Sequence, residues 1–209
     1  LVAMTAALRH RGPDDDGTYV DPRQRFAFGH RRLAIIDLSP AGHQPMSWAA
    51  GHFWITYNGE IYNYRELRHE LEQAGCAFRT HTDTEVLLAA YATWGERCLD
   101  RFRGMFAFAL ADEQKGEVFL ARDRFGIKPL LYATRPGAFL FASELCALRA
   151  SGLLSARVDR QAVWDYLSLV SVPQPATILA EAQALLPGSA MRVGFDGTVR
   201  RSWRWWSLA

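Results

Sequence analysis

The fold is decided by the stretch Tyr57–Asn63, YNGEIYN, which separates two different hydrophobic patterns. Before it, the β-branched and aromatic side chains of His52–Tyr57 predict a strand, and the pair Asn58-Gly59 is typical of the tight turn that ends one. After it, residues 63–72 place leucines four positions apart, and this spacing predicts a helix. The polar residues of the stretch therefore lie at the end of an element, where functional sites commonly lie.

Strand and helix patterns alternate on both sides of this stretch without an internal repeat. Hairpin turns join several neighbouring strands, so antiparallel sheets flanked by helices, an α+β fold, are favoured over parallel winding. Segment 172–187, with its prolines, is interpreted as a segment that crosses the domain and not as a flexible linker. Further strands are expected at residues 26–28, 33–36, 105–110, 118–121, 130–133, 138–142, 190–193 and 199–203. Further helices are expected at 1–8, 84–94, 143–148 and 159–169, the last two capped by Ser143 and Asp159.

The bulk composition is that of a globular protein with one large domain, because 49% of its 209 residues are hydrophobic and 22% are charged. A formal net charge of +2 is too small to favour nucleic acid or an anionic membrane as a partner. No apolar stretch approaches the roughly 18 residues of a membrane span, and Leu1–Leu8 lacks the basic lead-in of a secretion signal. The three cysteines suggest neither a disulfide framework nor a metal site, so a reducing cytoplasm is expected.

Four polar clusters stand at the ends of predicted elements, at residues 9–14, 29–33, 58–63 and 82–85. An arginine offers a fork of donors that fits a carboxylate, and an aspartate with a glutamate can hold an ammonium group. An asparagine amide beside a glycine N–H supplies two donors for a developing oxyanion. Together these groups describe an acyl-transfer pocket for a free amino acid. Each also has an ordinary interpretation: a surface ion pair for Arg32, a hairpin turn for Asn58-Gly59, a solvated charge for Glu60 and a helix N-cap for Asp83.

Five motifs run in order across nearly the whole chain: HRGPD at 10–14, GHRRLAIID at 29–37, YNGEIYN at 57–63, DTEV at 83–86 and RDRFGIKPL at 122–130. Together they resemble the glutaminase domain of asparagine synthetases. The resemblance implies an N-terminal-nucleophile hydrolase fold, an αββα sandwich of two antiparallel sheets between helical layers. It implies hydrolysis of L-glutamine to glutamate and ammonia. It also implies that the ammonia passes to a synthetase domain of the same polypeptide, where ATP with Mg²⁺ activates aspartate. No cofactor or metal is expected in the glutaminase domain itself, and a homodimer is one open option for its assembly.

The resemblance also assigns the site residues. Arg32 would bind the α-carboxylate of glutamine, and Glu60 and Asp83 would hold its α-amino group. The Asn58 side chain and the Gly59 N–H would form the oxyanion hole. Backbone groups of Leu33, Ala34, Ile35 and Ile36 would line the substrate. His10, His30, Asp123 and Lys128 are interpreted as structural or solvated residues, since the implied mechanism does not use them.

The nucleophile of this family is an N-terminal cysteine on a first strand, which is expected upstream of the present sequence. Cys76, Cys98 and Cys146 lie within the chain, carry no free α-amine and are interpreted as small buried residues. Residues 1–158 are expected to form the glutaminase domain, and residues 159–209 its end and the lead-in to a synthetase domain. Two other interpretations stay open. One is the amidotransferase of another acyl-adenylate-forming synthetase, and the other is a glutamine-binding module without catalysis.

Overall fold

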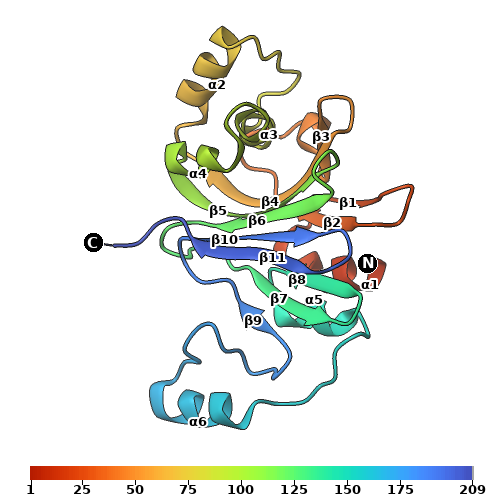
Figure 1. Cartoon of the computed structure of the whole chain (residues 1–209), viewed down its shortest axis with the longest axis vertical. Helices are drawn as coiled ribbons and strands as arrows, with labels where there is room; N and C mark the ends of the chain where they lie inside the picture. Colours follow the sequence, from red (N-terminus) through yellow and green to blue (C-terminus); the bar gives the residue numbers. More distant parts are fainter. Residues whose placement is uncertain (209) are drawn as a thin grey trace.

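The computed structural model describes residues 1–208 as two layers of antiparallel sheet packed between two layers of helix (Figure 1). The α+β sandwich expected from the sequence is therefore confirmed. No helix within this described range combines the length and the hydropathy that a membrane crossing requires.

The first layer is a six-stranded sheet of order β11-β10-β6-β5-β4-β3. Its two central strands, β5 and β6, are almost completely buried and carry alanine, phenylalanine and leucine on both faces, as a sheet covered on both sides requires. All of its pairings are antiparallel. The strands are β3 (Met46–Trp48), β4 (Phe53–Ile61), β5 (Gly104–Asp112), β6 (Glu117–Arg122), β10 (Ser189–Gly194) and β11 (Val199–Arg204).

The second layer is divided into two separate sheets. One is the hairpin of β1 (Asp15–Val20) and β2 (Ala27–Arg32), and the other has the order β8-β7-β9. The strands of the latter are β7 (Leu131–Arg135), β8 (Ala138–Ala142) and β9 (Gln183–Ala184). Strands β2 and β8 are therefore each paired on one side only, a fact on which the candidate site depends.

Helices cover the outer face of each layer (Figure 1). The first layer is covered by α2 (Tyr64–Gln73), α3 (Asp83–Trp94) and α4 (Cys98–Arg101). The second layer is covered by α1 (Val2–Ala7) and α5 (Leu145–Ala150), which pack against each other. Helix α6 (Arg160–Leu169) lies apart from both groups at one end of the molecule. Short 3₁₀ turns complete the chain at Arg9–Arg11, Pro40–Gly42 and Gly95–Arg97.

Three hydrophobic clusters hold these layers together. The largest lies between α2–α4 and the six-stranded sheet and contains fully buried side chains such as Leu87, Tyr91 and Phe119. The second lies between the two sheet layers, around Phe28 and Leu120. The third lies beneath α1 and α5. Helix α6 belongs to none of these clusters.

Three local predictions are wrong. Leu33–Ile36 is a loop rather than a strand, because the chain leaves the sheet after Arg32 and no strand pairs with these residues. The pair Asn58-Gly59 is not a turn but part of β4, where Gly59 packs so closely that an added Cβ would overlap the carbonyl oxygen of Met105. Helix α5 is capped at Glu144 and not at Ser143. By contrast, Asp159 caps α6 as expected, with its carboxylate accepting from the N–H groups of Gln161 and Ala162.

Candidate functional site

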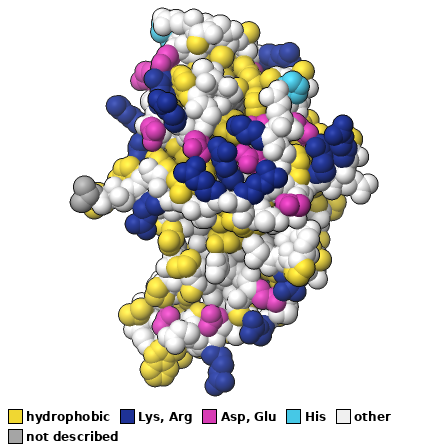
Figure 2. Space-filling view, viewed as in Figure 1, with side chains coloured by type: hydrophobic (Ala, Val, Ile, Leu, Met, Phe, Trp, Pro, Cys, Tyr) yellow, Lys and Arg dark blue, Asp and Glu magenta, His cyan; other side chains and the backbone are white. Residues whose placement is uncertain are grey.

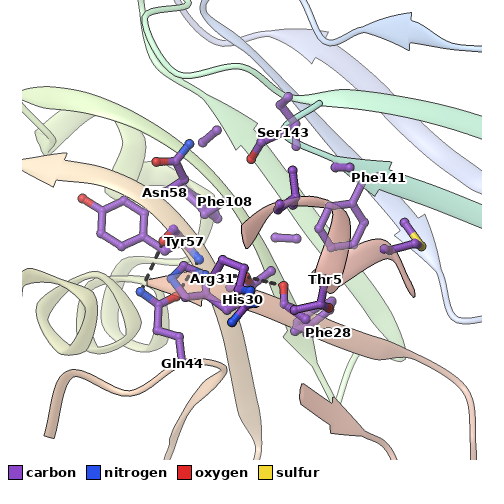
Figure 3. A pocket seen from close by; sticks show the side chains of 18 of the residues that line it. Thr5, Phe28, His30, Arg31, Gln44, Tyr57, Asn58, Phe108, Phe141 and Ser143 are labelled. Atoms are coloured by element: carbon purple, nitrogen blue, oxygen red, sulfur yellow. Dashed lines mark hydrogen bonds between the residues drawn. The ribbon is translucent and has the colours of Figure 1, made fainter. Parts of the chain in front are cut away.

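A cavity of about 590 Å³ opens between the two pieces of the second layer. Both β2 and β8 line it along their whole lengths, and each has one edge without a strand partner among the described residues. Ala107 to Ala109 of β5 contribute to its wall from the six-stranded sheet. Figure 3 shows Phe28 and His30 of β2, Phe141 of β8 and Asn58 of β4 gathered around this space. The cavity therefore has the shape of a gap between two sheets, with polar groups from β4 at one end.

Asn58 presents an unused donor to this cavity. Along β4, Thr56, Asn58 and Glu60 point to the face that meets the second layer, while Tyr57 and Ile61 point to the helices. The Asn58 Nδ2 is buried and has no hydrogen-bond partner anywhere in the described range 1–208. Buried polar groups are almost always satisfied, so an unpartnered amide that lines a cavity indicates that a ligand atom completes its hydrogen bonding.

Strand β3 pairs with β4 only as far as Ile55, and beyond that point the edge of β4 is capped by two side chains instead of a strand. Gln44 accepts from the Tyr57 N–H through Oε1 at 2.7 Å and donates from Nε2 to the Tyr57 carbonyl at 3.2 Å. Asp83 accepts from the Ile61 N–H through Oδ2 at 2.9 Å. Gly59 lies between Tyr57 and Ile61 on β4 and opposite Phe106 on β5. The N–H and the carbonyl of Phe106 both bond to Asp123, and therefore not to Gly59. In an antiparallel ladder alternate residues point their N–H groups to opposite edges. The Gly59 N–H therefore points out from the capped edge.

Asp83 is the first residue of α3, and Thr82 rather than Asp83 is the N-cap, since the Thr82 hydroxyl accepts from the Glu85 N–H. This frees the Asp83 carboxylate, which also accepts from the Tyr57 hydroxyl at 2.7 Å. Burial raises the pKa of Asp83 and Glu60 adds to this, against a lowering by the Ile61 N–H and the Tyr57 hydroxyl. The site thus contains a buried carboxylate that is bonded to two neutral donors and forms no ion pair within residues 1–208.

Arg32 ends β2 and is enclosed by the loop that follows it. Its guanidinium donates to the carbonyls of Asp37 and Ser39, the latter at 2.9 Å. Gly42 packs against it so tightly that a Cβ there would overlap the guanidinium. These contacts hold the Arg32 side chain in one position at the rim of the cavity.

The loop Leu33–Ile36 is largely exposed, and Leu33, Ile35 and Ile36 line the cavity. The Ala34 N–H instead donates to Asp14 at 2.9 Å, so this donor is not directed at the cavity. Glu60 also lines the cavity and is half-buried. Apart from Ala34, the residues expected to act together thus line one cavity, to which β2, β4, the loop after β2 and the start of α3 contribute.

His30 is a neutral base inside the same cavity. Burial, together with the charge of Arg32, lowers its pKa to about 4. Its Nδ1 lies 3.2 Å from the Thr56 hydroxyl, which gives its own proton to the Gly29 carbonyl. Because the hydroxyl has one proton, His30 must be the donor at Nδ1, and its Nε2 is left as an acceptor.

None of the three cysteines lines the cavity. Cys98 is fully buried in the largest core, and burial raises the pKa of its thiol well above the ordinary value. Cys76 follows α2 and contacts Thr93. Cys146 is exposed, contrary to the expectation of a buried side chain, and donates to Glu144 at 3.3 Å. His10 and Arg11 contact the same Glu144 carboxylate, so this cluster ties the first turns of the chain to α5.

Gln44 and the His30–Thr56 pair are features of the site that reasoning from the sequence missed. Gln44 stands in a loop with no strand or helix pattern, and its role depends on its packing against β4. Asp123, interpreted from the sequence as a structural or solvated residue, accepts from the N–H groups of Phe106 and Lys128. It thereby anchors the loop after β6 to β5, a structural role.

The two-layered sandwich has the fold of the N-terminal-nucleophile hydrolases, as its structural neighbours show. The fold matches that of the glutamine phosphoribosylpyrophosphate amidotransferase of Bacillus subtilis, with a TM-score of 0.71 and 21% identity over 99% of this chain and 46% of that one. A family model described as a glutamine amidotransferase domain matches residues 1–206. This chain therefore belongs to the glutamine amidotransferase domain family.

Two curated relatives from Bacillus subtilis are similar in sequence. Asparagine synthetase [glutamine-hydrolyzing] 1 is 43% identical over 196 residues, which are 94% of this chain and 30% of the relative. Asparagine synthetase [glutamine-hydrolyzing] 3 is 39% identical over 208 residues, which are 98% of this chain and 33% of the relative. The chain thus spans about a third of the length of these relatives.

The cap at β4 leads to a first prediction. Gln44→Met keeps the side-chain volume but leaves the buried N–H and carbonyl of Tyr57 without partners. We expect a loss of about 2–4 kcal/mol in the free energy of unfolding, because each unsatisfied buried group costs about 1–3 kcal/mol. Urea unfolding measures the loss, and hydrogen exchange at the Tyr57 and Gly59 amides should accelerate. Gln73→Met on the exposed face of α2 is the control. Equal stabilities of the two variants would show that Gln44 does not hold the edge.

A second prediction concerns pH. The unfolded chain protonates His30 near pH 6.5, whereas the folded protein protonates it only near pH 4. The contribution of neutral His30 to the free energy of unfolding is therefore at its full value above pH 6.5 and is lost as the pH falls toward 4. The loss amounts to about 3 kcal/mol. Urea unfolding of His30→Asn from pH 7 to 4 should show a shallower decline than the unsubstituted chain. His52→Asn, at an exposed position, should decline as the unsubstituted chain does, and the same slope for all three would contradict the prediction.

Proposed function

We propose that this chain binds L-glutamine at the polar end of the cavity, beside Asn58 and Gly59 of β4, and belongs to an enzyme that releases the amide nitrogen as ammonia. The observation that carries the proposal is the pair of adjacent donors at the site, the unpartnered Asn58 amide and the outward Gly59 N–H. Two donors on neighbouring residues are what a developing oxyanion of an attacked amide requires.

The remaining polar groups fit the two ends of an amino acid. Arg32, held in place by loop carbonyls, is positioned to bind the α-carboxylate. Asp83 lies close enough to Glu60 for the two charges to interact, and within residues 1–208 neither carboxylate forms an ion pair; the α-ammonium group of glutamine would supply the cation. Leu33, Ile35 and Ile36 would cover the substrate from the loop side. This arrangement favours an amino acid with a side-chain amide over a neutral or anionic small molecule.

The nucleophile is proposed to come from a strand that occupies the gap between β2 and β8. Such a strand would pair with both free edges and join the two pieces of the second layer into one sheet. An unpaired edge presents N–H and carbonyl groups, which favour pairing with a further strand. In the proposed reaction its N-terminal cysteine sulfur attacks the amide carbon, and the cysteine α-amine takes the thiol proton. That proton passes to the departing nitrogen, which leaves as ammonia. Water then hydrolyses the thioester to glutamate and restores the thiol.

We further propose that the ammonia serves an asparagine synthetase, in which ATP with Mg²⁺ activates aspartate on a separate domain of the same polypeptide. The names of the relatives with 39–43% identity support this acceptor. No cofactor is assigned to the present domain. A cytoplasmic location is proposed because its cysteines are free thiols, which a reducing compartment preserves.

The test compares this chain with a form extended upstream by a strand that begins with cysteine. Glutamate and ammonia should appear in equal amounts from the extended form, and Cys→Ala in the added strand should abolish both. Activity in the unextended chain would place the nucleophile among the described residues and overturn the mechanism. If folded extended protein neither binds nor hydrolyses glutamine, the proposed function is wrong. Addition of aspartate and ATP to the complete polypeptide then tests asparagine formation separately.

A further inference from the structure

Tyr57 reaches the candidate site from the opposite face of β4. Its ring lies in the largest hydrophobic cluster and is only 4% exposed, whereas the neighbouring Asn58 lines the cavity between the layers. The Tyr57 hydroxyl donates to Asp83 Oδ2 at 2.7 Å. Figure 3 shows the Tyr57 ring beside Asn58 and Gln44. No step of the proposed reaction uses this hydroxyl, so its contact with Asp83 serves another purpose.

The Asp83 carboxylate is held by one of its two oxygens. Oδ2 accepts from the Tyr57 hydroxyl and, at 2.9 Å, from the Ile61 N–H. Both hydrogen bonds that the carboxylate accepts from other residues within 1–208 therefore go to the same oxygen. Two donors on Oδ2 fix the orientation of the carboxylate, and Asp83 lines the cavity. Oδ1 is thus left for a donor that enters the cavity.

Asp83 differs from acidic residues elsewhere in the molecule that form ion pairs. Figure 2 shows lysine and arginine side chains beside acidic ones on the face that carries β10 and β11. There Arg192 forms ion pairs with Glu96 at 3.0 Å and with Glu117 at 3.2 Å. Asp83 is 5% exposed and has two neutral donors instead. Because an unpaired buried charge is costly, such a carboxylate is suited to a cation that arrives with the ligand.

The position of the Tyr57 hydroxyl is itself determined by packing. Gln44 bonds to the N–H and the carbonyl of Tyr57, and its Nε2 lies 3.4 Å from the hydroxyl of Thr84, the residue after Asp83. Burial raises the pKa of Tyr57 well above its ordinary value, and the charge of Asp83 adds to this. The hydroxyl therefore keeps its proton through the neutral pH range and remains a donor to the carboxylate.

We propose that Tyr57 is a positioning residue for the substrate, whose hydroxyl turns the Asp83 carboxylate so that Oδ1 meets an α-ammonium group. The inference rests on the proposed function, in which the cavity binds L-glutamine, and it concerns how the site selects its ligand. With Tyr57 in place, the site prefers an α-amino acid to an amide of the same shape that lacks the ammonium group. Tyr57 acts through Asp83 and does not itself contact the substrate.

Removal of the hydroxyl should also change the ionisation of Asp83. Burial raises the pKa of this carboxyl, and the Ile61 N–H and the Tyr57 hydroxyl oppose that rise. Tyr57→Phe removes one of these two contacts, so the pKa of Asp83 should rise further. The acid limb of glutamine affinity should then move up by about one pH unit. The other titratable or charged groups that line the cavity or flank Asp83 are unchanged in this variant, namely His30, Arg32, Asp37, Glu60, His81 and Glu85.

The test measures how strongly the present chain prefers L-glutamine to glutaramic acid, which is glutamine without its α-amino group. Calorimetry should give a preference of about 10- to 100-fold in the unsubstituted chain and about tenfold less in Tyr57→Phe. The matched control is Tyr91→Phe, because the Tyr91 hydroxyl donates to the buried Asp112 at 3.1 Å outside the cavity. Urea unfolding should show similar losses of stability in both variants, while only Tyr57→Phe should reduce the preference and move the acid limb.

An unchanged preference or an unchanged acid limb in Tyr57→Phe would overturn the inference, as would an equal fall of the preference in Tyr91→Phe. If the unsubstituted chain does not prefer glutamine to glutaramic acid, the proposed function fails and the inference falls with it. Carbon-13 NMR on the unsubstituted chain needs no variant. Glutamine should shift the Tyr57 Cζ signal and leave that of Tyr91 in place. A Tyr57 signal that glutamine does not move would contradict the inference even if Tyr57→Phe does not fold.

Discussion

Gly59→Ala should lower the rate of glutamine hydrolysis by at least a hundredfold in the cysteine-bearing form. A Cβ at this position overlaps the Met105 carbonyl oxygen and approaches the Phe106 Cα to 2.7 Å. Strand β4 must then move away from β5, and the Gly59 N–H moves with it. Loss of one oxyanion donor costs about 10²- to 10³-fold in kcat. The same overlap should lower the free energy of unfolding by about 1–3 kcal/mol.

The matched control is Gly188→Ala. A Cβ at Gly188 overlaps the Trp206 carbonyl oxygen, and Gly188 has a positive φ of 61°, so an alanine there is also sterically strained. Gly188 does not line the cavity. Thermal unfolding should show destabilisation in both variants, while kcat per folded molecule should fall only in Gly59→Ala. A parallel fall in both would mean that general loosening, and not the position of the Gly59 donor, determines the rate.

Asp83→Asn is expected to weaken glutamine binding by about 10- to 100-fold while leaving the fold as stable as before, or more stable. Hydrogen bonds to charged groups contribute about 1.5–3 kcal/mol, and the variant loses the carboxylate that would face the α-ammonium group. Titration calorimetry with L-glutamine on the present chain measures the Kd. This measurement does not require the nucleophile.

The expected effect on stability follows from the sign of the pKa shift. Burial raises the pKa of Asp83 in the folded protein. The stability that the group contributes is therefore present below the unfolded pKa and is lost as the pH rises through the folded one. The charged form of this buried carboxylate lowers the free energy of unfolding, because burial disfavours its charge. Asparagine removes that charge and still accepts from the Ile61 N–H and the Tyr57 hydroxyl. Maintained stability with weakened binding is the signature of a ligand site.

Asp112→Asn should show the opposite pattern. Asp112 is equally buried and contacts the Tyr91 hydroxyl, but it has its own cation in Lys115 at 3.0 Å and lies outside the cavity. This variant should lose stability and keep its glutamine affinity. If Asp83→Asn binds glutamine as tightly as the unsubstituted chain, the acidic pair does not hold the α-amino group.

Regular elements with a strong local pattern were predictable from the sequence. Helix α3 was expected at 84–94 and lies at Asp83–Trp94. Strands β10 and β11 were expected at 190–193 and 199–203 and lie at Ser189–Gly194 and Val199–Arg204, paired as a hairpin. In these segments the apolar spacing, the caps and the turn residues all favour one structure. Leu33–Ile36 shows where this reasoning fails, because an apolar run becomes a strand only if a neighbouring strand is available to pair with it.

The sequence by itself determined the family and the residue types at the site, because the motifs at 29–37 and 57–63 contain the arginine, asparagine, glycine and glutamate that such a pocket needs. Only the tertiary structure decided that Asn58-Gly59 lies within a strand, that Gln44 and Asp83 cap its edge, and that the gap between β2 and β8 is open. Each of these features depends on contacts between residues far apart in the chain, such as Gln44 with Tyr57 and Tyr57 with Asp83. Local propensity carries no information about such contacts, since they form only when the layers pack.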